Sequence, residues 1–336
     1  MGRAGRIAAA LAVVIFMQYA AIAEAASDGK IGFVRTSRRA SLIIAVDSDG
    51  TARVRLSQRW GINGEPEFSP DGSMIAYVNN RSIWVAGADG SERTRVARNG
   101  SDPRWSPDGT RILFTRERVD NDVAIFVVNV DGSGKSELTS GGINFSPDWS
   151  PDGSRIVFVR DVDIPHLFVM DADGSGLQRL TDGIGREDTA PRWSPDGSRI
   201  VFQRVRGSGR CAYRRDVFSI TADGSKVTRL TDTCRASESD PQWSPDGSAI
   251  AFARARRGRS QIFTMAPDGT NVDRLTDGPR RKGEPEWAPS GERIAFVSRL
   301  RGNSDLAVVK ADGTGARRLT RTQVDESSPT WQVVLP

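Results

Sequence analysis

One five-residue phrase, Trp-Ser-Pro-Asp-Gly, recurs along this chain and constrains its fold more than any other feature. One copy opens with phenylalanine, one degenerate copy reads Trp-Ala-Pro-Ser-Gly, and a last tryptophan stands close to the C-terminus. Recurrence at a regular spacing is the signature of a repeat architecture and must be recognised before single elements are interpreted. The aromatic residues that open the seven copies are Phe68, Trp105, Trp149, Trp193, Trp243, Trp287 and Trp331.

Each repeat contains signals for four short strands separated by turns. In Pro-Asp-Gly the proline presets φ, the aspartate binds nearby backbone amides, and the glycine accepts a positive φ. The runs between turns are rich in isoleucine, valine and phenylalanine with a two-residue alternation, which is typical of strands. A second turn ends in Asp-Gly, a strong hairpin signal, and precedes a run that ends in Leu-Thr. We call the four predicted strands A to D, with the tryptophan on strand A.

Repeats of about 44 residues with four strands each match the period of a β-propeller. The sequence therefore predicts an all-β propeller with seven four-stranded blades. The N-terminal part supplies strands B, C and D without a strand A, whereas the C-terminal segment supplies a strand A alone. Pairing of these two fragments would close the ring and remove exposed strand edges. Six blades is the alternative, should the terminal fragments not pair.

The first 25 residues differ from the rest of the chain. Arg3 and Arg6 precede an apolar run from 7 to 23, and Ala23-Glu24-Ala25 has the small-residue pattern of a cleavage site. These features predict a signal peptide over residues 1–25 and a periplasmic or extracellular location. An uncleaved membrane anchor is the alternative, because the apolar run is at the short limit of a membrane span. Residues 26–336 are then predicted to form a single propeller domain.

The segments PRWSPDGSRIVFQR and HLFVMDADGSGLQRLTD, with their recurrence, resemble the TolB-like β-propeller repeat. The resemblance extends from about residue 30 to the C-terminus. It implies the propeller fold, and it implies that partner peptides dock at the mouth of the central channel. TolB itself carries an α/β domain ahead of a six-bladed propeller, so this chain looks like a stand-alone relative of the family.

The strand order places the A–B and C–D turns on one face and the B–C and D–A loops on the other. The turns are short and uniform, whereas the loops vary, and varied loops on a rigid frame more often carry function. An acid precedes the proline of strand A in most D–A loops, and these acids are expected to ring one mouth of the channel. They are Glu65, Asp102, Asp188, Asp240, Glu284 and Glu326.

Carboxylates gathered in this way repel one another unless a cation lies among them. The functional interpretation is a site for a divalent cation or for a basic segment of a partner. The structural alternative is that each acid accepts hydrogen bonds from backbone amides and caps its own loop.

The B–C loops are basic. We assign Arg204 and Arg254 to these loops together with the arginines of a predicted basic rim, which are Arg214, Arg215, Arg256 and Arg257. Such a rim could bind an acidic protein, a glycan or a cell-wall polymer, and solvated surface charge is the alternative. The formal net charge of +5 is a mild excess. It favours an acidic partner weakly, and a nucleic-acid partner is not expected for a secreted protein.

The chain has two cysteines, Cys211 and Cys234. An even number in an oxidising compartment predicts one disulfide. Cys211 belongs to the longest B–C loop and Cys234 to the next D–A loop, so both are predicted on the same face of the same blade. Two free buried thiols are the alternative.

Catalysis is not expected. His166 is the single histidine, so a histidine-rich metal site is impossible, and no Gly-x-Ser-x-Gly motif is present. We therefore predict a monomeric, non-catalytic module, without a cofactor, that binds an envelope or extracellular protein or an anionic polymer. The alternative is a carboxylate-based glycan lyase or hydrolase, because two acids at the mouth would suffice for that chemistry. A further alternative is the scaffold of an envelope complex.

Overall fold

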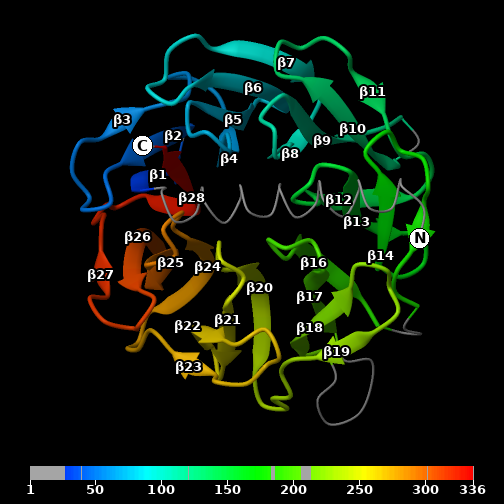
Figure 1. Cartoon of the computed structure of the whole chain (residues 1–336). Helices are drawn as coiled ribbons and strands as arrows, with labels where there is room; N and C mark the ends of the chain where they lie inside the picture. Colours follow the sequence, from blue (N-terminus) through cyan, green and yellow to red (C-terminus); the bar gives the residue numbers. More distant parts are fainter. Residues whose placement is uncertain are drawn as a thin grey trace.

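The described part of this protein has its regular structure in β-strands, which are arranged in sheets around a central axis (Figure 1). The computed structural model describes residues 27–38, 40–119, 121–182, 186–205, 213–300 and 302–335. The all-β propeller predicted from the repeat is confirmed. Within the described ranges there is no helix long and apolar enough to cross a membrane. The predicted signal peptide lies outside these ranges.

The strands group into four-stranded blades, each ordered A to D from the axis outwards. Blade 1 consists of β28 (Asp325–Val334), β1 (Ser27–Thr36), β2 (Ser41–Val46) and β3 (Val54–Arg55). Blade 2 consists of β4 (Asn63–Phe68), β5 (Met74–Asn79), β6 (Ser82–Gly87) and β7 (Thr94–Arg98). Blade 3 consists of β8 (Ser101–Trp105), β9 (Arg111–Glu117), β10 (Val123–Asn129) and β11 (Ser136–Glu137).

The remaining blades follow the same order. Blade 4 consists of β12 (Ile143–Trp149), β13 (Arg155–Asp161), β14 (His166–Asp171) and β15 (Gln178–Arg179). Blade 5 consists of β16 (Asp188–Trp193), β17 (Arg199–Val205), β18 (Arg215–Thr221) and β19 (Val227–Arg229). Blade 6 consists of β20 (Ser237–Trp243), β21 (Ile250–Arg256), β22 (Arg259–Met265) and β23 (Asp273–Arg274). Blade 7 consists of β24 (Arg281–Trp287), β25 (Arg293–Leu300), β26 (Asn303–Lys310) and β27 (Arg317–Arg318).

Two features of the pairing connect these units. A single parallel bridge between Val123 and Ile143 joins blades 3 and 4 into one eight-stranded sheet. In blade 1 the last strand of the chain, β28, pairs antiparallel with the first, β1, and Trp331 lies opposite Ile31. The two ends of the described chain thus share one blade, as the terminal fragments of the repeat predicted.

The hydrophobic core is divided among the spaces between blades. Seven clusters of buried side chains each join two neighbouring blades. The cluster between blades 7 and 1 contains Phe33 and Trp331 from blade 1 and Leu306 from blade 7. Tryptophans of strand A also donate hydrogen bonds to the preceding blade. Trp331 Nε1, for example, donates to the Glu286 carbonyl oxygen at 3.1 Å. The blades therefore stabilise one another around the whole ring.

The Ser-Pro-Asp-Gly phrase builds the A–B turn by local hydrogen bonds. In blade 3, the Ser106 hydroxyl donates to the Asp108 carboxylate at 2.6 Å and accepts from the Arg111 amide at 2.9 Å. The Asp108 carboxylate also accepts from the Thr110 amide at 3.0 Å. These side-chain contacts replace the backbone partners that a tight turn lacks. The Ser-Pro-Asp-Gly phrase therefore forms the A–B turn, as the sequence predicted.

The repeated glycine of the C–D turn is required for two reasons. Gly174 has a φ of 90°, which favours glycine. A Cβ at Gly174 would also lie 2.9 Å from the backbone oxygen of Leu138, which belongs to the Leu-Thr run of the preceding blade. In the next Leu-Thr run, the Thr181 hydroxyl accepts a hydrogen bond from the Leu167 amide of strand C at 3.0 Å. Asp-Gly and Leu-Thr therefore recur because neighbouring blades meet at these residues.

The ring closure can be tested with two glycines that have the same backbone conformation. Gly72 and Gly141 have φ values of 69° and 70°. A Cβ at Gly72 would lie 1.7 Å from the Val333 oxygen on β28, whereas a Cβ at Gly141 meets nothing within 4 Å. Gly141→Ala should lower the free energy of unfolding by about 1–2 kcal/mol through φ alone. Gly72→Ala should cost a further 1–3 kcal/mol, roughly, because β28 must move. Urea denaturation measures both, and equal losses would contradict the closing contact.

Candidate functional site in the central channel

Every strand A carries the same backbone irregularity, which decides what faces the channel. The residue three positions before the aromatic residue has a φ between 50° and 56° in all seven blades, and a proline follows it. The register of strand A against strand B shifts at this point in each blade, which marks a β-bulge. The left-handed residues are Glu65, Asp102, Ser146, Ala190, Asp240, Glu284 and Ser328.

The bulges form the mouth of the channel on the face of the B–C and D–A loops. A cavity of 280 Å³ lies there, and four of the predicted acids line it, which are Glu65, Asp102, Asp240 and Glu284. Ala190 and Ser328 occupy equivalent positions in two other blades. We call these four carboxylates the mouth acids. The structure thus brings together four of the six residues that the sequence proposed.

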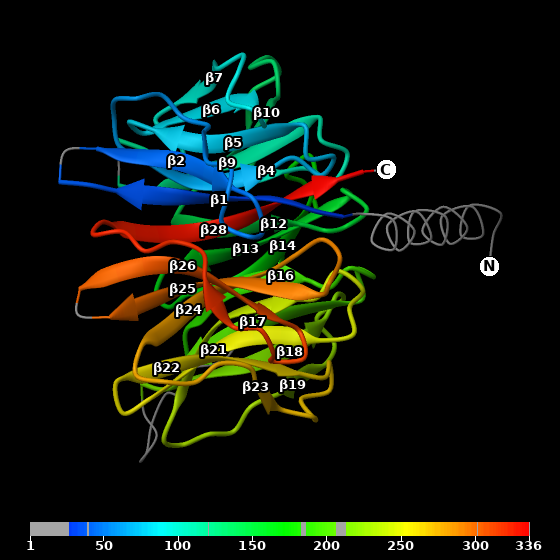
Figure 2. The same ribbon diagram turned by 90° about the vertical axis from the view of Figure 1, so that its left-hand side faces the viewer.

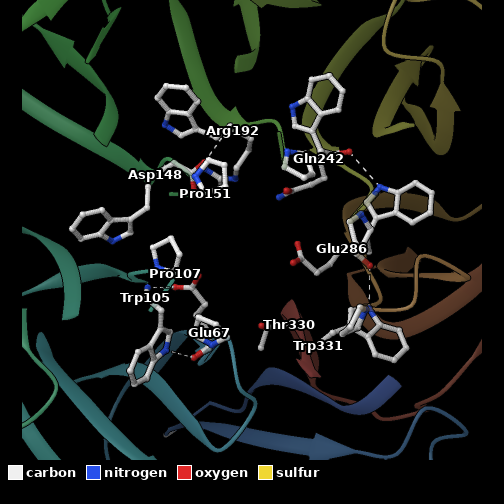
Figure 3. A pocket seen from close by; sticks show the side chains of 18 of the residues that line it. Glu67, Trp105, Pro107, Asp148, Pro151, Arg192, Gln242, Glu286, Thr330 and Trp331 are labelled. Atoms are coloured by element: carbon white, nitrogen blue, oxygen red, sulfur yellow. Dashed lines mark hydrogen bonds between the residues drawn. The ribbon is translucent and has the colours of Figure 1, made fainter. Parts of the chain in front are cut away.

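Deeper in the channel, the residues directly before the aromatic residues form a ring with one member from each blade. Figure 3 shows labelled members of this ring around an open centre. The waist ring, as we call it, consists in order of Glu67, Arg104, Asp148, Arg192, Gln242, Glu286 and Thr330. A second cavity of 440 Å³, walled by the prolines of the A–B turns and the tryptophans, lies beyond it. Because five of the seven members line both cavities, the ring separates the mouth from this second cavity.

Several of these carboxylates also link neighbouring blades through backbone amides. The Glu67 carboxylate accepts from the Trp105 amide at 3.2 Å, and the Asp148 carboxylate accepts from the Trp193 amide at 2.9 Å. At the mouth, the Glu284 carboxylate accepts from the Ser328 amide at 2.7 Å. These carboxylates therefore accept hydrogen bonds from backbone amides, as the structural alternative proposed. The amides belong to the next blade, however, and not to the acid's own loop.

The charges of the waist ring alternate over half of its circumference, where Arg104 and Arg192 flank Asp148. Burial raises the pKa of Glu67 and of Glu286 to about 7, although the two arginines oppose this shift. Burial acts to lower the pKa of Arg104, but the surrounding carboxylates raise it above its usual value. The ring therefore holds two fixed positive charges and two glutamates that change charge near neutral pH.

The repulsion that the sequence suggests among the mouth acids is a minor influence on the pKa of Glu65. The pKa of Glu65 is raised, but burial is the main cause and the charge of Asp102 contributes less. Asp102 instead forms an ion pair with Arg104 of the waist ring at 3.2 Å. Basic side chains among the acids thus offset part of their repulsion.

Two of the predicted acids lie inside their blades and not at the mouth. Asp188 is fully buried and binds Arg204 through both carboxylate oxygens, with the second contact at 2.7 Å. Glu326 is likewise buried and pairs with Arg35 at 2.9 Å. Both acids stand five residues before their aromatic residue, where the bulge has reversed the side-chain alternation. Their role here is to neutralise the buried Arg204 and the half-buried Arg35.

Two arginines lie elsewhere than the sequence predicted. Arg204 and Arg254 were expected on the B–C loops, but both lie in strand B with their guanidinium groups over phenylalanine rings. Arg254 pairs with the buried Glu238 at 2.8 Å, at the position that Asp188 takes in blade 5. The predicted basic rim itself is exposed to solvent, as expected for Arg214, Arg215, Arg256 and Arg257.

The cysteine and cation predictions remain untested. Cys211 lies outside the described residues, so its disulfide with Cys234 stays a prediction. Across the described ranges, no group of three or more histidine, cysteine, aspartate or glutamate side chains is arranged to hold a metal ion. A divalent cation in the channel therefore has no support from a ligand cluster. His166 lies buried at the start of β14, a strand C.

The waist ring was not predicted from the sequence. Its members differ in charge and size, so no recurring residue type marks them. The available signal was positional, because each member stands directly before the aromatic residue of strand A. Since strand A is the innermost strand of a propeller blade, that position could have been examined as a channel-facing set.

Comparison with known proteins supports the fold and the family. A family model described as the TolB beta propeller domain matches residues 13–164, 139–233 and 188–335. A TolB homologue of Chlorobaculum tepidum is 33% identical over 119 residues, which are 34% of this chain and 27% of the relative. The chain aligns with between an eighth and about a quarter of the length of the first curated relatives it matches.

Solved structures show the same fold at low sequence identity. A structure described as TolB from Agrobacterium tumefaciens superposes with a TM-score of 0.60 at 22% identity, covering 84% of this chain and 98% of that one. An oligogalacturonate lyase in complex with manganese superposes with a TM-score of 0.65 at 16% identity, covering 81% and 82%. These likenesses establish the architecture alone.

The different roles of the predicted acids can be measured by stability. Asp188→Asn leaves the buried Arg204 without its carboxylate partner and should cost roughly 3–5 kcal/mol. Asp240→Asn at the mouth should change the free energy of unfolding by less than about 1 kcal/mol, because asparagine tolerates the left-handed conformation. Urea denaturation of both variants provides the comparison. A large loss in Asp240→Asn with little effect in Asp188→Asn would reverse these assignments.

The waist ring should make stability depend on pH. The folded protein holds protons on Glu67 and Glu286 up to about pH 7, whereas the unfolded chain releases them near pH 4.5. Stability from these groups is therefore lost as the pH rises from about 4.5 to 7. The double variant Glu67→Gln/Glu286→Gln should lack this loss and exceed the wild type at pH 8 by roughly 3–7 kcal/mol, since each glutamate alone accounts for about 3 kcal/mol. Denaturation curves at pH 5 and pH 8 that give the same difference between the proteins would refute the raised pKa values.

Proposed function

Because the chain belongs to the TolB β-propeller family, we propose that it is a non-catalytic binding module of the cell envelope, located in the periplasm or outside the cell. Its partner is a protein that inserts a basic segment into the channel mouth. The observation that carries this proposal is the convergence of the four mouth acids on one cavity. TolB proteins among the relatives agree with an envelope role.

The mouth suits a side chain better than a whole small molecule. Its 280 Å³ is slightly below the usual range of small-molecule sites, and carboxylates from four blades surround it. A lysine ammonium or an arginine guanidinium fits both the size and the charge, and a carboxylate accepts charge-assisted hydrogen bonds from either. The bulges and the following prolines hold the acids in place before binding, which reduces the entropy cost of complex formation.

The waist ring extends this complementarity into the channel. Glu286, Thr330 and Glu67 are consecutive around the ring, so one side of the channel is acidic while the opposite side carries the arginines. A cation that reaches this depth would bind on the acidic side, near blades 7, 1 and 2. Its charge would favour ionisation of both glutamates. Binding and proton release are therefore coupled at this site.

A photo-reactive amino acid at Ala190 tests the mouth directly, because this residue lines the cavity without contributing charge. Cross-linking in cells should capture one defined partner through a segment that contains lysine or arginine. Asp102→Asn/Asp240→Asn should reduce the yield about tenfold, as expected for the loss of two charge-assisted contacts.

The matched control is Glu92→Gln/Asp273→Asn, which removes two exposed carboxylates on the outer edge of the ring. This variant should cross-link like the wild type. A captured segment without basic residues, or equal losses in both double variants, would contradict the proposal.

The affinity for that basic segment should also rise with pH. Between pH 6 and pH 8 the wild type gains negative charge on Glu67 and Glu286, because their pKa values are about 7. Glu67→Gln/Glu286→Gln should bind more weakly and show little change over this range. Calorimetric titration with the cross-linked segment as a synthetic peptide measures both. A wild-type affinity that falls with rising pH would argue against insertion to the waist ring.

The enzymatic alternative has one supporting observation. Two carboxyl groups with a pKa near 7 border a cavity of 440 Å³, and groups with such pKa values suit general acid and base catalysis. A screen of polyuronates and other acidic glycans, with the same double glutamine variant as the control, tests it. Glycan cleavage that the variant lacks would replace the binding module with a lyase or hydrolase.

A further inference from the structure

The most exposed large apolar side chains of the described residues lie on loops of one face. Five of them are more than 60% exposed, and no other large apolar side chain in the described ranges exceeds 46%. Val119 is fully exposed, and the others are 65% to 88% exposed. Apolar residues this exposed are unfavourable in water and mark a site of interaction when they gather on one face. The five, which we call the apolar tips, are Trp60, Ile62, Val119, Val162 and Tyr213.

The topology places every apolar tip on the face of the B–C and D–A loops. Trp60 and Ile62 lie in the D–A loop between β3 and β4, and Val119 lies in the loop between β9 and β10. Val162 follows β13, and Tyr213 precedes β18. Figure 2 shows the molecule from the side, with the β1–β2 and β25–β26 loops at the left and the end of β28 at the right. The tips belong to the face with these loops, along an arc from blade 1 to blade 5.

Arginines stand beside the tips. The guanidinium of Arg59 lies 5.7 Å from the ring centre of Trp60, and Arg214 and Arg215 directly follow Tyr213. The next B–C turn, in blade 6, carries the rim arginines Arg256 and Arg257. Within the described residues none of these five arginines forms an ion pair with a carboxylate. Their charges are therefore available to an external anion.

The spacing of the tips favours a lipid surface over a protein. The core of a protein interface is a contiguous, closely packed apolar patch. Here the five tips come from four loops, and apart from the pair Trp60 and Ile62 they project singly, with charged or polar neighbours. Tryptophan, tyrosine and arginine together suit the bilayer interface, where rings lie at headgroup level and guanidinium groups bind anionic phosphates.

We propose that the loop face docks on a membrane leaflet rich in anionic phospholipids, with the apolar tips inserted among the headgroups and the arginines on the phosphates. The mouth acids do not take part, because they lie in strand A at the centre of this face. The proposal is independent of the peptide partner, since it uses the outer loops and not the channel. Docking would turn the channel mouth towards the lipid surface.

Sedimentation with vesicles tests the proposal on the full chain. The probes are vesicles of phosphatidylcholine alone and of phosphatidylcholine with phosphatidylglycerol in roughly equal amounts. The wild type should bind the anionic vesicles and should bind phosphatidylcholine at least about tenfold more weakly, because each arginine near an anionic surface adds attraction. Trp60→Ser/Val119→Ser/Tyr213→Ser should weaken binding to anionic vesicles at least about tenfold through lost apolar burial.

The chain offers a matched control on the opposite face. Leu177, Val227 and Val272 are each 41% to 46% exposed and lie at or directly before the start of strand D, beside the C–D turns. Leu177→Ser/Val227→Ser/Val272→Ser should bind vesicles like the wild type. Asp102→Asn/Asp240→Asn should also bind like the wild type, which separates this surface from the peptide site.

Three results would overturn the proposal. The first is no binding of the wild type to anionic vesicles, which would leave the tips to a protein partner. The second is equal weakening by the two triple serine variants, because that would show no dependence on the loop face. Binding that survives the loss of the tips would equally refute insertion, since it would rest on charge alone.

Discussion

Each blade of this protein can bury its apolar faces only against its two neighbours, and this constraint organises the rest of the structure. The seven clusters of the core all lie between blades, and each combines side chains from both sides. No blade can therefore be stable alone, and the ring is complete only when β28 pairs with β1. The C–D turns repeat the same geometry from blade to blade, because the glycines of one blade contact the Leu-Thr run of the preceding blade.

The same constraint determines where polar chemistry can lie. A charge buried between blades is accepted only when it is paired or hydrogen-bonded, as Asp188 and Arg204 are. Free carboxylates are left to the axis and to the loops. At the axis, the bulge in strand A turns one residue of six of the blades into the mouth and one residue of every blade into the waist ring. The residues of the candidate site are therefore positioned by the same strand A bulge that recurs in every blade.

The repeat predicted the fold because its turn and strand signals are local in sequence and recur along the chain. Pro-Asp-Gly, Asp-Gly and Leu-Thr each specify a turn or a contact, and the partial repeats at the two ends predicted the pairing of the first and last strands. The candidate site was harder to predict. A regular strand would place residues one, three and five positions before the tryptophan on the same face, so Asp188 and Asp240 looked equivalent.

The bulge removes that equivalence. In blade 6, Gln242 and Ser239 lie opposite Ala251 and Ala253, whereas Glu238 lies opposite Arg254 on the other face of the sheet. A proline follows the left-handed residue in all seven blades, but no single residue type marks the left-handed position itself. Glutamate, serine, aspartate and alanine all adopt the left-handed conformation here, so the residue at this position did not predict the bulge.

The pairing of β1 with β28 has a consequence for how the protein is made. Its first strand must wait for nearly the whole chain to be synthesised before its inner partner exists, since Ser27 pairs with Val334. Contacts so distant in sequence form late and slowly. Until then Phe33 and its neighbours lack the tryptophan that covers them, so the nascent ring exposes an apolar edge. Chain synthesis thereby sets the earliest moment at which the native protein can exist.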